Sequence, residues 1–517
     1  MSTASAPSRH RPAIALVTVT AVLFVTFLDT TIVSVTLADI QEQLHAGVAS
    51  LQWVINAYTL TFAALMLSGG SLGDRFGRKK VMVAGLVVFC AGSVVAALAQ
   101  NVTALVVGRA VMGVGAAGSE PGTLSVLRHL YPDRAARAKA LGLWAAVSGL
   151  ALALGPVLGG LLLDSFGWRS VFWFNLAFGV VVLAATALFV PDSSDPQPGR
   201  FDWTGFVLGA VGLATIIYAV IAGERTGYRT AEMVTLFVIG GLALAGFVLM
   251  ELRVRNPLIQ FAYLGKPSVR SALLVAFAVY FGVFSIFFFT ALYLQVVMGY
   301  SGMRTSALFT PMAIAIIGGS LLSGLWVARQ GARIPMLVGC VLAAAGLLVT
   351  RELLSGTIEF GSLSAAMALA GLGFGVAIVP LTSAVLSGVP AAHSGMAAAA
   401  TNTMRQVGAV VGVAALGSVV NSYLTGDLAA KLNRDPFYRS MTSMVVDAVQ
   451  TGSAPNGGTI RGPHSAPVMK LLKLAFASFE HGVSMALLVS AVLILIAAAL
   501  AAIATRGERA TAGFDAD

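Results

Sequence analysis

The segment GGSLGDRFGRKK, residues 69–80, closes one long apolar run at 51–72 and opens the next at 81–99. Each run is long enough for an α-helix to cross a bilayer, which takes about 20 mostly apolar residues. Gly70, Gly73 and Gly77 allow the two helices and a tight turn to approach closely. The segment therefore predicts a charged turn at a membrane surface, with a membrane-spanning helix on each side.

The rest of the chain repeats this alternation. Of its 517 residues, 57% are apolar and 10% are charged, whereas a soluble domain carries about 25% charged residues. Cys90 and Cys340 both lie inside apolar runs, which excludes a disulfide framework. Most of the 32 Lys and Arg residues stand in small groups between the runs, without the basic stripe typical of nucleic-acid binding. We therefore expect a polytopic membrane protein with no nucleic-acid partner.

Fourteen runs are long enough to cross a bilayer, and they are too long and too evenly apolar for the strands of a membrane barrel. The expected fold class is an all-α polytopic membrane protein with 14 transmembrane helices. The first run is too long for a signal peptide and contains Asp29, so we expect a true span. The runs lie near 13–37, 51–72, 81–99, 104–127, 140–163, 170–190, 204–222, 232–250, 269–297, 305–327, 334–351, 361–386, 395–420 and 481–504.

Two further patterns predict the orientation and the domains. The short loops on one side carry most of the Lys and Arg, which places both termini in the cytoplasm. The turn SGLWVARQGAR at 323–333 is a worn copy of 69–80 without its acid, which suggests two six-helix halves with two inserted spans. The expected parts are a cytoplasmic N-terminus at 1–12, a six-helix bundle at 13–190, inserted spans and linkers at 191–268, a second bundle at 269–504 with a long outside loop at 421–480, and a cytoplasmic tail at 505–517.

Four charged residues lie well inside the predicted spans: Asp29, Arg109, Glu120 and Arg405. Each costs about 2.5–3.5 kcal/mol at mid-bilayer, so each is a candidate functional residue. For Asp29 we favour proton or cation binding, and the alternative is a structural pair with Arg109. Arg405 follows Asn402 in the thirteenth span, and its alternatives are structural pairing and substrate contact.

Glu120 lies eleven residues after Arg109, three turns along the same helix, so the two share a face without touching. Three interpretations stay open for this carboxylate. It is a second titratable group for proton coupling, a counter-charge for cationic substrates in a cavity, or an ordinary residue near the inner water interface.

Two glycine-containing motifs complete the candidates. The first turn puts charges beside glycines, and we interpret it as a conformational latch rather than simple anchoring of positive charge. The latch consists of Gly70, Gly73, Asp74, Arg75, Gly77 and Arg78. Small residues and a proline in the fifth span predict close helix contact and a bend. They are Gly155, Pro156, Gly159 and Gly160.

Enzyme signatures are missing from the sequence. Residues 113–118 match a dinucleotide-binding G-x-G-x-x-G, but they lie inside a predicted membrane helix and not after a strand. The six histidines are scattered without metal-ligand spacing, and the chain has no P-loop. We expect no enzyme activity, no metal and no cofactor, and without a P-loop ATP does not drive the protein directly.

Together these motifs resemble the major facilitator superfamily, and specifically its fourteen-span drug:proton antiporters. Residues 70–80 resemble the superfamily's motif A, and residues 105–116 resemble motif B. Residues 149–160 resemble motif C, which is associated with antiporters, and residues 28–33 resemble the first-helix motif of proton-driven exporters. The start of the sixth span resembles that of the same exporters at Gly167, Trp168, Arg169, Phe172 and Asn175.

The resemblance implies a major facilitator fold in the cytoplasmic membrane that works as a monomer by alternating access. Asp29 would carry the proton while Arg109 tunes it, and small amphipathic substrates, cations among them, would enter an apolar midplane cavity. Its expected lining residues, for which lipid-facing packing is the alternative to the phenylalanines, are Trp53, Asn56, Tyr58, Glu120, Phe284, Phe288, Asn402 and Arg405. Other functions left open are export of a single metabolite, antibiotic or lipid, import, and a receptor without transport.

Overall fold

The computed structural model describes residues 10–504 apart from 46–47, 194–201, 255–256, 301, 355–358, 435–438, 440–441 and 443–464. Within these ranges the elements are helices, and no strand occurs among them. Thirteen of the helices are long and apolar enough to cross a membrane, and α6 adds a fourteenth when its two arms, which meet at 41°, count as one span. The expected all-α fold with 14 transmembrane helices is therefore confirmed.

The first part of the chain forms α1 His10–Ile32, η1 Val33–Thr36, α2 Leu37–Leu44, α3 Val48–Phe76, α4 Arg78–Ala97, α5 Val102–Leu130, α6 Arg134–Phe166 and α7 Arg169–Phe189. Two helices follow, α8 Trp203–Thr226 and α9 Ala231–Glu251, and then the short α10 Phe261–Leu264. The last part forms α11 Pro267–Val296, α12 Gly302–Gln330, α13 Arg333–Leu354, α14 Phe360–Gly388, η2 Ala391–His393, α15 Ser394–Arg434 and α17 Ser465–Ala504.

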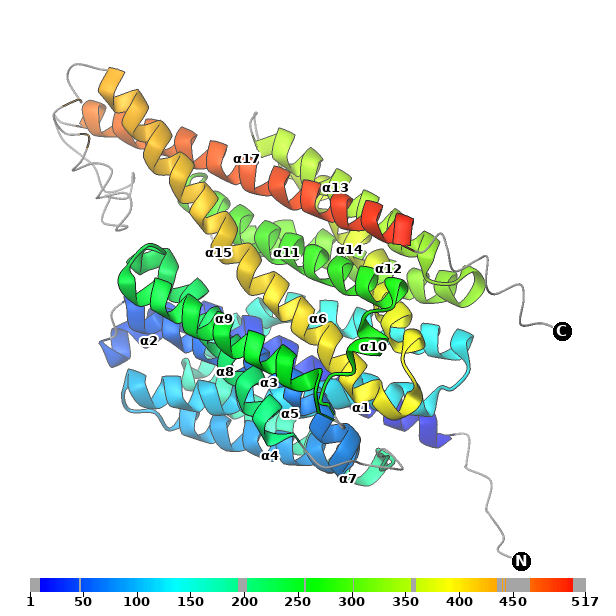
Figure 1. The fold of residues 1–517 in the computed structure, drawn as a ribbon. Coiled ribbons are helices and arrows are strands. Elements are labelled where there is room, and N and C mark those ends of the chain that lie inside the picture. The colour runs from blue at the N-terminus through cyan, green and yellow to red at the C-terminus, as the bar shows by residue number, and fades with distance from the viewer. Residues whose placement is uncertain are drawn as a thin grey trace, which may run out of the picture.

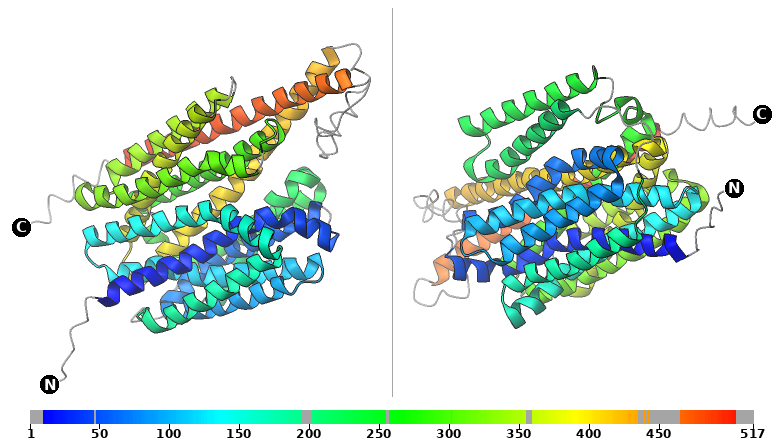
Figure 2. Two further views of the ribbon diagram at one scale, coloured as in Figure 1. Left: turned by 180° about the vertical axis from the view of Figure 1, so that it is seen from behind. Right: turned by 90° about the horizontal axis from the view of Figure 1, so that it is seen from below.

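The long helices run side by side in two groups (Figure 1). Helices α1 and α3–α7 make the N half, and α11–α15 with α17 make the C half. Helices α8 and α9 pack on each other, and α8 contacts α3 and α15 at one side of the boundary between the halves. Figure 2 shows the same pair lying outside both groups when the molecule is seen from below. The start of α1 and the end of α17 lie at one end of the bundle, which we call the termini end, opposite the far end.

Short turns with side-chain caps connect these helices. Asn101 accepts the backbone N–H of Ala104 at 2.8 Å and begins α5. Asp133 accepts the N–H of Ala136 at 2.7 Å and begins α6. Each cap satisfies an N–H group that the first helical turn leaves without a partner, a contribution of about 1 kcal/mol.

The outside loop expected at 421–480 is shorter than predicted. Helix α15 has 41 residues and continues to Arg434, and α17 has 40 residues and begins at Ser465. Both exceed the ~20 residues that a bilayer requires. Their extra turns pack through Leu428, Leu432 and Ala475, so apolar contact between the two helices extends the bundle at the far end.

The two halves touch through matched glycines, which supports the internal repeat. A Cβ on Gly70 of α3 would overlap the backbone of Gly395 in α15. A Cβ on Gly324 of α12 would lie 2.8 Å from the carbonyl oxygen of Ala138 and 3.1 Å from Gly142, both in α6. Gly70 and Gly324 occupy the same position in the two copies of the turn, so the repeat places a glycine where α3 crosses α15 and where α12 crosses α6.

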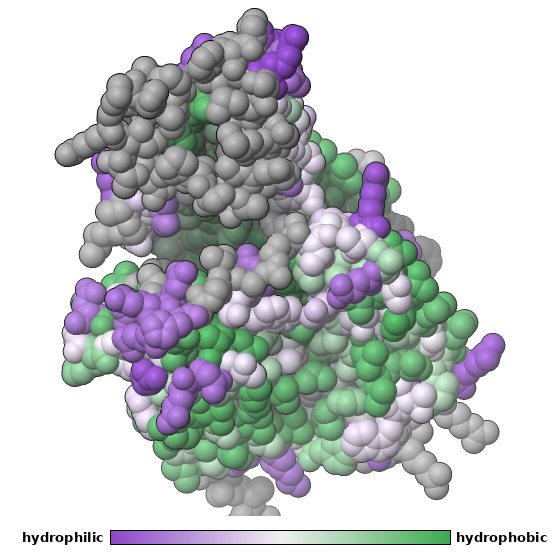
Figure 3. Space-filling view, turned by 90° about the vertical axis from the view of Figure 1, so that its left-hand side faces the viewer, coloured by the Kyte–Doolittle hydropathy of each residue, from purple (hydrophilic) through white to green (hydrophobic). Residues whose placement is uncertain are grey.

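Seen from the far end, the molecule is hollowed between the two halves, and the depth of this hollow is hydrophobic (Figure 3). At the termini end, by contrast, hydrogen bonds cross the boundary. Ser125 and Ser394 lie 2.8 Å apart through their hydroxyls, and Arg137 donates to Ser387 at 3.3 Å. The halves are therefore closed against each other at the termini end.

Candidate functional site

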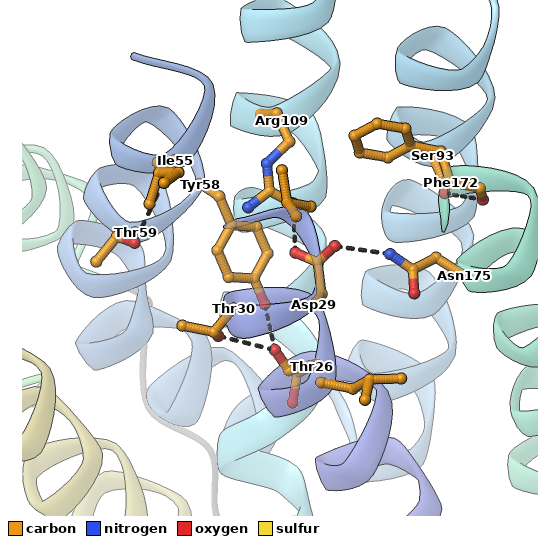
Figure 4. A network of polar contacts seen from close by, with 12 residues as sticks. Thr26, Asp29, Thr30, Ile55, Tyr58, Thr59, Ser93, Arg109, Phe172 and Asn175 are labelled. Atoms are coloured by element: carbon orange, nitrogen blue, oxygen red, sulfur yellow. Dashed lines mark hydrogen bonds and ion pairs between the residues drawn. The ribbon is translucent and has the colours of Figure 1, made fainter. Parts of the chain in front are cut away.

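The first candidate site is a buried ion pair near the far end. Asp29 of α1 is 0% exposed and pairs with Arg109 of α5, which is 1% exposed. Asn175 of α7 donates its amide N–H to the other carboxylate oxygen of Asp29 at 2.7 Å. Figure 4 shows the carboxylate between these two donors. Each oxygen of Asp29 thus has a donor, the arrangement that a buried carboxylate requires.

Arg109 is itself held by two further contacts. Its Nε donates to the carbonyl oxygen of Val54 in α3 at 2.9 Å. Its guanidinium lies 4.5 Å from the ring centre of Tyr58, whose hydroxyl donates to the carbonyl of Thr26 at 3.0 Å. Tyr58, expected in the substrate cavity, therefore belongs to the ion-pair network. Four helices, α1, α3, α5 and α7, meet at this site.

The second candidate site lies about 16 Å from Arg109 along α5, the rise of eleven helical residues. Glu120 is 1% exposed here, so it is buried in the protein and not at the surface. Trp144 connects it to Arg405 of α15, because the indole N–H donates to Thr123, three residues after Glu120, at 3.1 Å and the indole ring lies 5.0 Å from the guanidinium. Glu120 and Arg405 therefore face each other across the boundary without forming a direct ion pair.

Residues of both halves hold Arg405, with hydrogen bonds from the C half and aromatic rings from both. Its Nη1 donates to Asn402 at 3.0 Å, and its Nη2 donates to Thr382 of α14. The guanidinium lies 5.0 Å from the ring of Trp144 and 5.4 Å from that of Tyr280. The structure thus places Glu120, Asn402 and Arg405 in the same region of the boundary, around Trp144.

The other expected cavity residues are more dispersed. Trp53 stacks on Tyr218 of α8 at 5.2 Å, against the inserted helices. Phe284 stacks on Tyr280 at 6.3 Å, beside the second site. Phe288 is 48% exposed, the position that the lipid-facing alternative predicts, and Asn56 is partly exposed on α3.

The latch residues join the two halves at the termini end. Asp74 accepts the backbone N–H groups of Gly395 and Met396, both at 2.9 Å, and so caps α15. Arg78 donates to Asp74 at 2.8 Å and to the carbonyl of Ala391 at 3.1 Å. This charge cluster reaches across the boundary, as the latch hypothesis requires.

The remaining latch residues shape the turn. Gly77 has a φ of 106°, a conformation that other residues rarely adopt. Gly73 accepts the N–H of Gly77 at 3.1 Å and thereby closes the turn. The guanidinium of Arg75 lies over the ring of Phe76 at 5.4 Å.

The fifth-span motif lets α6 approach α1. A Cβ on Gly155 would overlap Thr31, and one on Gly159 would lie 2.7 Å from the carbonyl of Ile32. Gly160 does not take part in this helix contact, since a Cβ there would meet no described atom within 4 Å. The bend of α6 falls at residues 153–156, which include Pro156. The motif therefore holds the helix that carries Asp29 against α6.

Several contacts of the site residues are seen in the structure but were not predicted from the sequence. Trp144, Tyr280 and Thr382 hold Arg405, yet as single residues in apolar runs they gave no signal of that role. Asn175 had a signal, since an amide inside an apolar span needs a partner, but the sequence did not identify Asp29 as that partner. Among the described residues, no three His, Cys, Asp or Glu side chains come together to hold a metal ion.

The chain is similar to known transporters along most of its length. Residues 19–413 match the family model of the Major Facilitator Superfamily. The multidrug resistance protein Stp of Mycobacterium tuberculosis is 33% identical over 479 residues, covering 90% of this chain and 87% of that protein. The tetracenomycin C resistance and export protein of Streptomyces glaucescens is 31% identical over 507 residues, covering 97% and 93%.

A solved structure agrees with the fold. The human organic anion transporter MFSD10 (TETRAN) superposes with a TM-score of 0.60 at 13% identity, over 95% of this chain and 100% of that one. The relatives are transporters and not enzymes. From its helices, its paired halves and these matches, the chain belongs to the major facilitator superfamily, and relatives that it matches over most of its length are drug-resistance and export proteins.

Proposed function

We propose that this protein is a proton-driven antiporter that exports small amphipathic drugs or antibiotics across the cytoplasmic membrane by alternating access. The observation that carries the proposal is the buried pair of Asp29 and Arg109. A carboxylate placed inside a membrane bundle is costly, and here every contact of Asp29 is one that protonation would weaken. Asp29 is thus the proton carrier, and Arg109 and Asn175 are its partners.

The proton cycle follows from these contacts. A proton that enters from the far end, which we assign to the outside, neutralises Asp29 and releases Arg109 from its ion pair. The four helices that meet at the pair then change their packing, and the halves reopen toward the cytoplasm. Loss of the proton inside restores the pair. One charge crossing 100 mV supplies about 2.3 kcal/mol, enough to sustain a drug gradient of more than tenfold.

The latch residues make the contacts that form and break as the protein changes conformation. With both termini in the cytoplasm, the contacts of Asp74 and Arg78 with α15 close the inner side of the protein. Opening inward breaks the two cap hydrogen bonds of Asp74. The transporter works as a monomer without a cofactor, because each half supplies its own part of the sites and the proton gradient supplies the energy.

We infer the substrate class from the relatives, which include a multidrug resistance protein and a tetracenomycin C resistance and export protein. Small drugs would bind between the halves at Glu120, Asn402 and Arg405. Measuring ethidium efflux from cells that express the chain, with and without a protonophore, tests the function. We expect active efflux that the protonophore stops. Absence of efflux from a well-expressed protein would contradict multidrug export and favour export of a single metabolite.

A further inference from the structure

The second site contains three polar atoms that face no partner. They are Oε2 of Glu120, Nδ2 of Asn402 and Nε of Arg405, and each is buried without a hydrogen bond to any described group. The side chains are 1%, 1% and 2% exposed. Since buried polar groups are nearly always hydrogen-bonded, one acceptor and two donors at one place indicate a site for a ligand.

These atoms cannot satisfy one another in this arrangement. The carboxylate of Glu120 and the guanidinium of Arg405 do not form a direct ion pair, although both lie beside Trp144. Arg405 is also unable to turn freely, because its other nitrogens donate to Asn402 and Thr382. Its Nε is therefore held in a fixed position, where no described group of the protein accepts its hydrogen.

The surroundings of the three atoms are aromatic. Trp144 and Tyr280 lie beside the guanidinium at 5.0 and 5.4 Å. Trp144 is fixed in turn, since its Nε1 donates to Thr123 at 3.1 Å, one turn after Glu120 on α5. Phe284 stacks on Tyr280 at 6.3 Å and is partly exposed. Aromatic surface thus leads from the buried polar atoms toward the far end.

The charges at this site decide what kind of ligand fits. A permanent cation at this site would lie close to the guanidinium of Arg405, so a cation such as ethidium would bind there more weakly than an uncharged ligand. An uncharged group that both donates and accepts hydrogen bonds satisfies all three atoms at once. A phenolic hydroxyl can donate to Glu120, while a carbonyl can accept from Arg405 and Asn402.

We propose that Glu120, Asn402 and Arg405 anchor the polar edge of an uncharged aromatic substrate that carries a hydroxyl and a carbonyl group. This inference rests on the proposed function and specifies the substrate class of the exporter. Glu120 belongs to the N half, and Asn402 and Arg405 belong to the C half. The substrate therefore bridges the boundary, and it must lose one set of contacts when the halves separate.

The test compares matched ligands on the purified full-length protein in lipid nanodiscs by calorimetry. The probes are 2-hydroxyanthraquinone, its 2-methoxy analogue and tetraphenylphosphonium, in acidic buffer that keeps the phenol uncharged. We expect the methoxy analogue to bind about tenfold more weakly, because it has no hydroxyl hydrogen to donate to Glu120. Tetraphenylphosphonium should bind more weakly than the phenol. Equal binding of the phenol and its methoxy analogue to the unsubstituted protein would by itself overturn the proposal.

Variants then assign the effect to the site. Glu120→Gln and Arg405→Lys should each remove most of the preference for the hydroxyl compound. The same changes at exposed positions, Glu42→Gln and Arg270→Lys, should preserve it. Proton-driven ethidium efflux is measured in cells that express the same chains. Normal efflux combined with equal binding of the two ligands would refute this substrate class and leave the proposed function standing. Absent efflux combined with a preserved preference for the hydroxyl compound would refute the proposed function and leave the ligand site standing.

Discussion

Asp74 and Gly395 meet across the boundary between the two halves, where the Asp74 carboxylate accepts the backbone N–H of Gly395 at 2.9 Å. The equivalent position in the second copy of the turn is Ala328, which has no carboxylate. Helix α6, the counterpart of α15, is capped by its own Asp133 instead. The latch is therefore one-sided, and a single acid in the N half holds the first turn of a helix in the C half.

Asp74→Ala should open the termini end. It removes two cap hydrogen bonds and the partner of Arg78, a loss of about 1–2 kcal/mol from the closed arrangement. The closed population should then fall about fivefold or more relative to the open one. Double electron–electron resonance between spin labels at Lys80 and Ile334, in a chain without Cys90 and Cys340, measures the distance across the termini end. This distance should be longer in Asp74→Ala than in the parent chain.

Asp133→Ala is the matched control for this experiment. It removes a cap of the same kind, but one that lies within the N half and does not cross the boundary. We expect the distance between Lys80 and Ile334 to stay as in the parent chain. Equal distances in the Asp74 and Asp133 variants would show that the cap across the boundary does not hold the halves together.

Gly70→Ala should stop transport without preventing folding. The added methyl group would overlap the carbonyl of Gly395 and the side chain of Ala399 when the termini end is closed, but not when the halves separate. Ethidium efflux should fall by tenfold or more at equal expression. Gly160→Ala has room for its methyl group and should transport normally, and similar efflux from both variants would argue against close contact at Gly70.

Ser125→Cys combined with Ser394→Cys should lock the termini end shut. The two hydroxyl oxygens lie 2.8 Å apart across the boundary, so the thiols can oxidise to a disulfide. Oxidation should abolish efflux, and a reductant should restore it. The single Ser125→Cys variant should not respond to either reagent. Full efflux from a chain whose cross-link is complete on a gel would refute alternating opening at this end.

Asp29→Asn should abolish proton-coupled efflux. The amide can still accept from Asn175, and Arg109 keeps the carbonyl of Val54, so we expect the protein to remain folded in the membrane. Ethidium efflux should become insensitive to a protonophore and fall to the background rate. Asp164→Asn, the same change at an exposed site, serves as the control. Protonophore-sensitive efflux that persists in Asp29→Asn would exclude this residue as the proton carrier.

The sequence by itself predicted the spans, the repeat and the charged residues of both sites. Hydrophobic length determines the spans because lipid cannot satisfy backbone hydrogen bonds. Asp29, Arg109, Glu120 and Arg405 were evident because a charge inside a membrane is expensive. The limit of an apolar run is a weaker signal, so the sequence did not reveal that α15 continues to Arg434.

Only the tertiary structure decided which of these charges meet. Asp29 and Arg109 are 80 residues apart, and the crossing of α1 and α5 at a specific depth brings them into contact. Whether Glu120 faces Arg405 depends on how the two halves close against each other, and Trp144 and Tyr280 come from two further helices. Pairing across helices depends on packing angle and register, which local periodicity does not encode.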